Sequence, residues 1–258
     1  MPLPNNLNWR MTLLFLLALL LLGFVMKLVA LLIPSASSGP RPFMFWLLPS
    51  TASLRPAPPV RDNWRLYLRA TLWAGVVSVG YWIYWKLVGV LHLRGMVLSY
   101  LAVPLLVSVG EMTVAVLTVL FLPGGQLLPP LLERPLAARS VAEFWGRRWN
   151  LWFSDWFRRV IFRPLHREPV VALFLVFAVS GLMHELVVNL PLYCLTRRSL
   201  FGSMMIYFLL QAVGILCERY FFKPRPRLMR VFAWFVVFIP APLLFNQGML
   251  RTMHLWPE

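Results

Sequence analysis

Long apolar runs separated by polar segments dominate this sequence. Six of the runs are long enough to cross a bilayer as a helix, which takes about 20 residues. They cover residues 11–33, 66–91, 96–122, 170–192, 200–222 and 228–250. The pattern predicts an all-α fold, a polytopic transmembrane helix bundle in which residues 1–258 form one integral membrane domain. The first run is longer than the core of a signal peptide, which favours a permanent anchor.

The longest polar section, residues 123–169, separates the third run from the fourth. Its tryptophans recur at spacings of 4, 3 and 4, which places them on one stripe of a helix: Trp145, Trp149, Trp152 and Trp156. Four arginines flank the stripe, namely Arg147, Arg148, Arg158 and Arg159. This pattern predicts an amphipathic helix in the membrane interface, with Trp toward lipid and Arg toward phosphates. It does not account for Asn150, a polar residue directly after Trp149.

The composition supports a membrane protein. Hydrophobic residues make up 60% of the 258 and charged residues only 13%, whereas soluble domains are about half apolar and a quarter charged. The net charge of +16 would suggest nucleic acid as a partner of a soluble protein. We reject that interpretation because the arginines cluster in loops between apolar runs. Anionic lipid headgroups or a phosphate-bearing cosubstrate remain as partners.

The distribution of positive charge predicts an orientation. The loops after the first, third and fifth runs hold most of the Lys and Arg, including eight arginines between Arg134 and Arg167. Cytoplasmic loops retain such charges, so the 123–169 section is expected on the cytoplasmic side, with both termini outside. The host is expected to be a bacterial inner membrane or an endoplasmic reticulum. The oligomeric state is left open.

An ionisable pair interrupts the fourth run, in the stretch "SGLMHELVVNLP" from Ser180 to Pro191. His184 lies 14 residues beyond Val170, or roughly 21 Å along a straight helix, past the middle of a hydrocarbon core about 30 Å thick. A polar group at that depth is costly when it faces lipid. The side chain of His184 is therefore expected to line a protein cavity or a water path.

Two chemistries and one structural role compete for His184. A zincin needs H-E-x-x-H, but Val188 stands where the second histidine would be, so we expect no metal and no other cofactor. A low-dielectric cavity favours the neutral imidazole, which can deprotonate a hydroxyl as a general base. Alternatively, His184 only hydrogen-bonds to a neighbouring helix. This residue alone does not decide.

Three further polar residues are candidates for lining the same cavity. Ser180 lies one helical turn before His184 on a similar face, whereas Glu185 and Asn189 share a different face. Glu111 lies in the middle of the third run. A carboxyl group paired with a neighbouring helix is the expected role for Glu111.

Two blocks in the correct order carry a resemblance to a known family. "EFWGRRWN", from Glu143 to Asn150, is followed some thirty residues later by "VSGLMHEL", which contains His184. Together they resemble the signature of membrane-bound O-acyltransferases, most closely the wax synthase branch. The similarity covers about residues 143–191 well and the last two runs loosely. The first third of the chain is similar only in being hydrophobic.

The resemblance implies an MBOAT-like fold and an acyl transfer from acyl-CoA, as cosubstrate, to the hydroxyl of a lipophilic alcohol inside the bilayer. It implies that His184 is the catalytic residue and that Asn150 is the second characteristic position. Acyl-CoA binding is expected from neighbouring residues of the first block and from the basic residues after it: Trp145, Arg147, Arg148, Trp149, Arg158 and Arg159. Plant wax synthases are longer and have more spans, which leaves the shape of the substrate tunnel open.

Two functions from other classes stay open. One is a proton-coupled transporter in which His184, Glu185 and Glu111 relay protons, although no pair of matching broken helices supports it. The other is a catalytically silent membrane subunit that keeps the fold without turnover. Coenzyme A release with a panel of alcohols would separate these three functions.

Overall fold

The computed structural model describes residues 6–32, 55–56, 63–122, 125–222 and 225–257. Within them, six helical segments are long and apolar enough to cross a membrane: Leu7–Leu32, Trp64–Leu91, Met96–Phe121, Pro169–Thr196, Ser203–Phe221 and Pro226–Leu244. Each coincides with one of the predicted runs, so the all-helical, multi-span fold is confirmed. The only β-structure in the described ranges is a two-residue antiparallel pair, β1 (Arg55–Pro56) with β2 (Gln126–Leu127).

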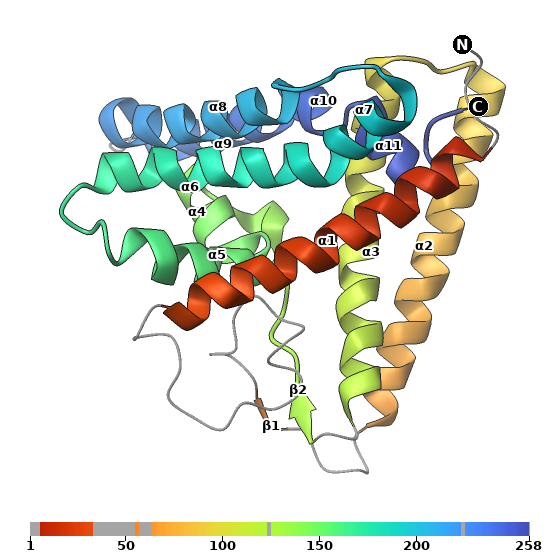
Figure 1. Ribbon diagram of the computed structural model, residues 1–258, viewed down its shortest axis with the longest axis horizontal. Coiled ribbons are helices and arrows are strands. Elements are labelled where there is room, and N and C mark those ends of the chain that lie inside the picture. The colour runs from red at the N-terminus through yellow and green to blue at the C-terminus, as the bar shows by residue number, and fades with distance from the viewer. Residues whose placement is uncertain (1–5, 33–54, 57–62, 123–124, 223–224, 258) are drawn as a thin grey trace.

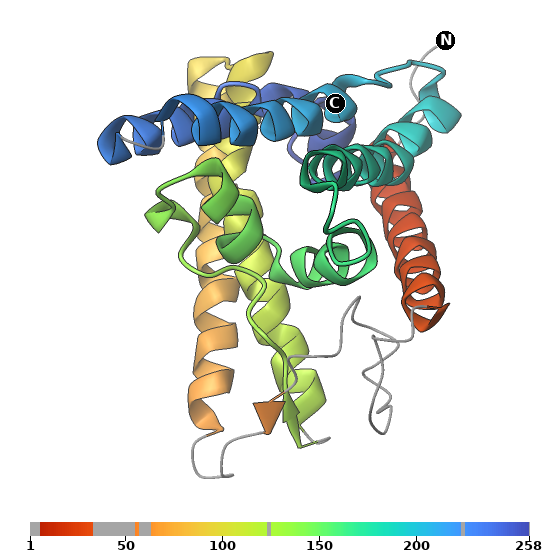
Figure 2. The ribbon, with the colours of Figure 1, turned by 90° about the vertical axis from the view of Figure 1, so that its left-hand side faces the viewer.

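The second and third long helices pack against each other. Helices α2 (Trp64–Leu91) and α3 (Met96–Phe121) form an antiparallel hairpin (Figures 1 and 2). Helix α1 (Leu7–Leu32) lies apart from this hairpin in Figure 2 and packs mainly against Glu185–Thr196 and Gln247–Thr252. The turn of the hairpin uses His92 in the left-handed region at φ 49° and Gly95 at φ 63°. Glycine adopts this conformation at little cost, so the chain can reverse within a few residues.

The C-terminal half is built from shorter helices with interruptions. In order they are α6 (Pro169–His184), the π-helical turn η8 (Glu185–Asn189), α7 (Leu190–Thr196), α8 (Ser203–Cys217), η9 (Glu218–Phe222), α9 (Pro226–Phe238), α10 (Ala241–Leu244) and α11 (Gln247–Thr252). Both α6 and α8 run across the direction of the α2–α3 hairpin in Figure 1. The six spans therefore do not share one axis, and a residue count along α6 does not measure the depth of His184.

Close packing joins α6 to α8. A Cβ atom added at Gly181 would lie 3.0 Å from Cα of Met205, closer than nearly all side-chain contacts. Only glycine at this position lets the two backbones approach so closely. Pro169 stands at the start of α6, where its missing N–H costs nothing.

Hydrogen bonds fix the C-terminal segment onto the hairpin. The hydroxyl of Tyr81 donates to the carbonyl of Met253 at 2.7 Å, and the hydroxyl of Tyr84 donates to the carbonyl of Leu255 at 2.7 Å. Ser99 donates in the same way to the carbonyl of Phe245. The two halves of the molecule are thus connected through main-chain carbonyls that have left helical geometry.

The section predicted as one amphipathic helix is divided. It forms η5 (Pro135–Ala137), α4 (Val141–Glu143), the π-helical turn η6 (Phe144–Arg148), α5 (Leu151–Phe157) and the π-helical turn η7 (Arg158–Phe162). Between η6 and α5, Trp149 is extended and Asn150 is left-handed at φ 43° and ψ 59°. The prediction of a continuous helix was wrong because the tryptophan spacing carries no signal for this change in backbone direction.

The four tryptophans do not form a single lipid-facing stripe. The indole N–H groups of Trp152 and Trp156 donate to the carbonyls of Pro129 and Met26, both at 2.9 Å. That of Trp145 donates to Oε1 of Gln211 at 3.1 Å. The ring of Trp149 stacks on Phe144. These rings therefore pack the section onto the rest of the protein, and three of the four indole N–H groups donate to protein acceptors.

Candidate active site

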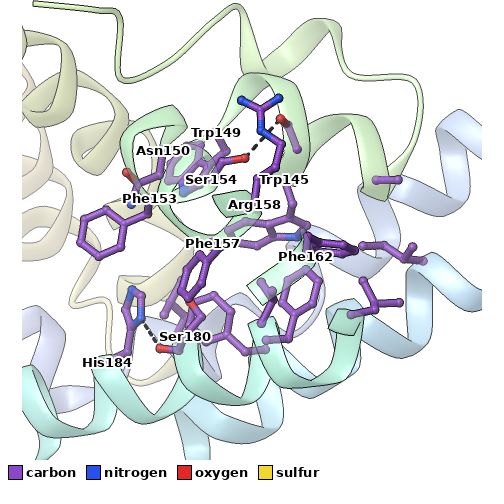
Figure 3. A pocket seen from close by; sticks show the side chains of 18 of the residues that line it. Trp145, Trp149, Asn150, Phe153, Ser154, Phe157, Arg158, Phe162, Ser180 and His184 are labelled. Atoms are coloured by element: carbon purple, nitrogen blue, oxygen red, sulfur yellow. Dashed lines mark hydrogen bonds between the residues drawn. The ribbon is translucent and has the colours of Figure 1, made fainter. Parts of the chain in front are cut away.

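A cavity of about 620 Å³, partly open to the surface, lies between the divided section and the α6–α8 pair. Its walls come from α3, from residues 131–132, from α4 through η7, from α6, from α8 and η9, and from α10 and α11. Most lining side chains are aliphatic or aromatic, and a few polar groups stand among them. His184 and Asn150 both line this cavity, on opposite walls (Figure 3).

His184 is held in one tautomer by its own helix. Its Nδ1 lies 2.8 Å from the carbonyl oxygen of Ser180, one turn earlier in α6. Because a carbonyl only accepts hydrogen bonds, Nδ1 must carry the proton, and Nε2 then carries a free lone pair. Among the described residues Nε2 has no hydrogen-bond partner. The imidazole can therefore accept a proton from a group in the cavity.

The ring of His184 is also fixed by packing. Its centroid lies 4.5 Å from that of Phe208 on α8, with the planes tilted by 43°. In Figure 3 the ring rises from α6 toward α5, which forms the facing wall with Asn150 at its start. Directly after His184 the helix widens into the π-helical turn η8. Such turns interrupt regular helices and occur often at functional sites.

Asn150 presents an unused acceptor. Its Oδ1 is buried and has no hydrogen-bond partner among the described residues. Its left-handed backbone places it at the break between η6 and α5, where the N–H of Leu151 donates to the carbonyl of Leu131 at 2.9 Å. Asparagine tolerates this conformation better than most residues. A buried acceptor without a partner is costly, which is expected where a ligand supplies the missing donor.

Ser180, Trp145, Trp149 and Arg158 line the cavity, as expected from the sequence. The other three arginines of the predicted set do not. Arg147 is exposed, Arg148 pairs with Glu143 at 2.5 Å, and Arg159 pairs with Asp155 at 3.1 Å. A basic residue not predicted for the site, Arg219 of η9, lines the cavity instead.

The two candidate carboxylates have other roles. Glu111 is not among the lining residues, because it pairs with Arg69 of α2 at 2.7 Å across the hairpin. Glu185 is buried and turned away from the cavity, and its Oε1 accepts from the N–H groups of Gly202, Met204 and Met205. It therefore caps the start of α8, where unpaired N–H groups and the helix dipole favour an anion. The pairing expected between Glu111 and a neighbouring helix is present, whereas Glu185, the other candidate, does not line the cavity.

A second carboxylate supports the opposite wall. Glu218, at the other end of α8, is buried and accepts hydrogen bonds from the N–H groups of Val141 and Ala142. These N–H groups begin the segment that leads to Trp145, Trp149 and Asn150. The sequence offered one signal for this role, which is a lone carboxylate at the end of an apolar run. A buried carboxylate there needs donors, and a helix start provides them.

Glu143 stabilises the same segment at its outer side. Its pKa is lowered from the ordinary value, although partial burial opposes the shift by raising it. The backbone N–H of Arg139 and the guanidinium of Arg148 both favour the charged carboxylate and outweigh burial. Arg148 also donates to the carbonyls of Glu133 and Arg134 at 3.2 Å. This arginine therefore connects the segment to the irregular residues 133–134.

Residues 128–210 match the Membrane bound O-acyl transferase family. This range includes Asn150 and His184. A probable long-chain-alcohol O-fatty-acyltransferase 7 of Arabidopsis thaliana is 32% identical over 101 residues, which cover 35% of this chain and 29% of the relative.

Two further relatives match shorter stretches. The long-chain-alcohol O-fatty-acyltransferase of Simmondsia chinensis is 40% identical over 68 residues, 22% of this chain and 19% of the relative. The acyl-CoA–sterol O-acyltransferase 1 of Arabidopsis thaliana is 36% identical over 69 residues, 23% of this chain and 20% of the relative. The similarity to these three curated relatives therefore spans less than a third of the length of each.

Proposed function

We propose that this chain, whose residues 128–210 match the Membrane bound O-acyl transferase family, transfers a fatty acyl group from acyl-CoA to the hydroxyl of a lipophilic alcohol. The single observation that carries the proposal is that His184 and Asn150, far apart in the sequence, line one largely apolar cavity. The notable polar features of that cavity, a free imidazole nitrogen and an unpaired amide oxygen, are suited to moving a proton and orienting a hydroxyl.

In this mechanism His184 is the general base. Its Nε2 accepts the proton of the alcohol while the oxygen attacks the thioester carbonyl. The new carbon–oxygen bond forms, the carbon–sulfur bond breaks, and the imidazolium returns its proton to the departing thiolate of coenzyme A. The carbonyl of Ser180 holds Nδ1–H at 2.8 Å throughout, which keeps the reactive nitrogen directed into the cavity.

Asn150 acts on the reactants from the facing wall. Its buried Oδ1 accepts a hydrogen bond from the alcohol or from an amide N–H of the pantetheine arm, which would satisfy the atom left unpaired in the free protein. Its NH₂ group is a donor to the oxyanion that develops on the thioester carbonyl. The left-handed backbone at Asn150 holds the amide at a fixed position relative to His184.

Positive charge at the cavity favours the phosphates of coenzyme A. Arg158 and Arg219 both line it and are both exposed. A guanidinium group can donate two parallel hydrogen bonds to the oxygens of one phosphate. These two arginines are therefore the candidates for binding the nucleotide end of acyl-CoA. Arg158 follows the third span and Arg219 lies at the end of the fifth, and the charge distribution assigns the loops after these two spans to the cytoplasmic side. We infer that acyl-CoA enters there.

The acceptor is proposed to be apolar. The named activities of the relatives include long-chain alcohols and a sterol. An aliphatic and aromatic wall offers binding energy to either class through burial of hydrocarbon. The alcohol would enter from the bilayer, where such molecules partition.

The test uses the full chain, purified and reconstituted in liposomes. Long-chain acyl-CoA is supplied with a panel of long-chain primary alcohols and a sterol, and both free coenzyme A thiol and ester product are measured. The proposal expects ester formation with at least one acceptor. Release of thiol without ester would indicate hydrolysis, and transport of a solute or protons without consumption of acyl-CoA would favour a carrier. Either result would overturn the proposal.

A further inference from the structure

The cavity is elongated along α6. Residues of this helix line it from Pro169 to His184, a rise of roughly 22 Å at 1.5 Å per residue. Glu185 binds the start of α8, so α8 runs back alongside α6 and its last residues lie at the Pro169 end. Arg219 therefore belongs to the end remote from His184. The cavity has a basic end, and His184 and Asn150 stand well inside it.

The cavity also has walls from α3, α10 and α11, and α11 packs against η8, the turn directly after His184, so these walls lie at the His184 end. Its walls there are Leu106 and Gly110 of α3, Leu131 and Leu132 of the segment beside Asn150, Leu244 of α10 and Met249 of α11. None of these side chains bears a group that hydrogen-bonds strongly. This apolar end thus has the opposite character to the end at Arg219, and hydrocarbon is the ligand chemistry that it fits.

Gly110 is the one place in the apolar end where a side chain is missing. It is the sole glycine of α3 and follows Leu106 by one helical turn. A Cβ atom built there would lie 3.5 Å from Cδ2 of Leu131 and 3.8 Å from Cδ1 of Leu132, which is ordinary contact. A methyl group therefore fits without strain, whereas a larger side chain would extend into the space between the helix and these leucines.

We propose that the apolar end binds the hydrocarbon tail of the acyl group and that Gly110 sets the longest tail accepted. The inference rests on the proposed acyl transfer. An acyl-CoA is one linear molecule, with phosphates at one end, a thioester within it and a tail at the other. If the phosphates lie at Arg219 and the thioester at His184, the tail continues past His184 and reaches Gly110.

The experiment compares chain-length profiles. For the parent, Gly110→Ala and Gly110→Leu, kcat/KM is measured with acyl-CoA of increasing length at one alcohol, and then with alcohols of increasing length at one acyl-CoA. Gly75→Leu is the matched control, because Gly75 lies on α2 and its added Cβ meets nothing within 4 Å. Neither leucine substitution costs helix stability, since leucine favours helix more than glycine does.

The expected result is a shift in the acyl series only. Gly110→Leu should lower kcat/KM for the longest acyl chains by at least about tenfold, the usual effect of one misplaced methylene in an apolar pocket, and leave short chains unchanged. Gly110→Ala should give a smaller shift and Gly75→Leu none. The opposite change, Leu131→Ala, removes the side chain nearest to Gly110 and should extend the range to longer tails.

Three outcomes would overturn the inference. One is an unchanged acyl profile in both Gly110 variants, another is a shift in the alcohol series instead, and the third is equal loss for all acyl lengths in Gly110→Leu together with no extension in Leu131→Ala. Failure of the parent with every acyl-CoA would instead reject the proposed function, on which the inference depends. The two failures are therefore distinguishable.

Discussion

Two sets of polar residues lie near the end of α6, one on the cavity side and one on the other side. They differ in whether their polar atoms have hydrogen-bond partners in the protein. On the cavity side, Nε2 of His184 and Oδ1 of Asn150 have no partner among the described residues. On the other side is the Glu185 cluster, which we define as Glu185, Asn189, Ser203 and Asn246. There, Nδ2 of Asn189 donates to Glu185 at 2.6 Å, and Nδ2 of Asn246 donates to Asn189 at 3.0 Å.

The difference separates a binding role from a structural one. Neighbouring residues in the sequence, His184 and Glu185, belong to different groups because adjacent helical residues point in different directions. A satisfied buried cluster rigidifies the fold, whereas polar atoms without a protein partner are available to a ligand. Activity should therefore respond to changes in the first group, and stability to changes in the second.

The largest expected effect is that of His184→Ala on acyl transfer. Loss of the general base should lower kcat by about 10³-fold, the middle of the range for such groups, while the protein stays folded. Ester formation and the thermal unfolding midpoint in detergent are measured together. His166→Ala is the control, because His166 is exposed and does not line the cavity. Transfer near the parent rate in His184→Ala would refute the assignment.

The next effect is that of Asn150→Gly. Glycine keeps the left-handed backbone at φ 43° and removes only the amide. We expect kcat to fall by about 10²-fold, as on removal of one oxyanion donor, with little change in stability. Asn150→Ala should reduce activity by as much and also reduce stability, because alanine is strained at this φ. Full activity in the glycine variant would show that the amide takes no part.

Glu185→Ala is expected to change the free energy of unfolding rather than kcat, and by a smaller amount than the two effects above. Three N–H groups at the start of α8, one buried and two partly buried, lose their acceptor, which should lower the free energy of unfolding by about 2 kcal/mol. The readout is the unfolding midpoint in detergent. Glu185→Gln retains an acceptor oxygen and should recover much of the loss. If Glu185→Ala abolished turnover in protein as stable as the parent, the contrast between the two groups would fail.

The smallest effect is a pH dependence at Glu143. Because the pKa of this carboxyl group is lowered on folding, its contribution to stability is fully present above the ordinary value and is lost as the pH falls through the folded pKa. The pair with Arg148 is partly solvated, so the contribution is about 0.5 kcal/mol. Unfolding midpoints measured from neutral to acidic pH should decline less in Glu143→Gln than in the parent. Parallel declines would contradict the prediction.

The sequence predicted the spans better than the contacts that support the cavity. Apolar runs are long and need no knowledge of neighbours, so all six spans were found within a few residues at most ends. The divided helix was missed because the change depends on a single left-handed residue, Asn150. The separation of Glu185 from the cavity depends on the start of α8, a contact from a distant part of the chain that periodicity does not encode.

Basic residues were predicted least well, for a related reason. Five or more arginines stand near the first block, and their positions alone do not tell which are consumed by local carboxylates. Asp155 pairs with both Arg158 and Arg159, and Glu143 pairs with Arg148. Arg219 was overlooked because it lies at the end of a different span, brought to the cavity by the antiparallel packing of α6 and α8.

A carboxylate forms hydrogen bonds at each end of helix α8. At its start, Glu185 accepts from the N–H of Met204, and at its end Glu218 accepts from the N–H groups of Val141 and Ala142. Helix α8 therefore holds the block that contains His184 at a fixed distance and orientation from the block that ends at Asn150. Shortening or lengthening it by one residue would rotate one block against the other by about 100°. An insertion in the middle of α8, remote from both blocks in sequence, should therefore misalign them as thoroughly as damage within either one.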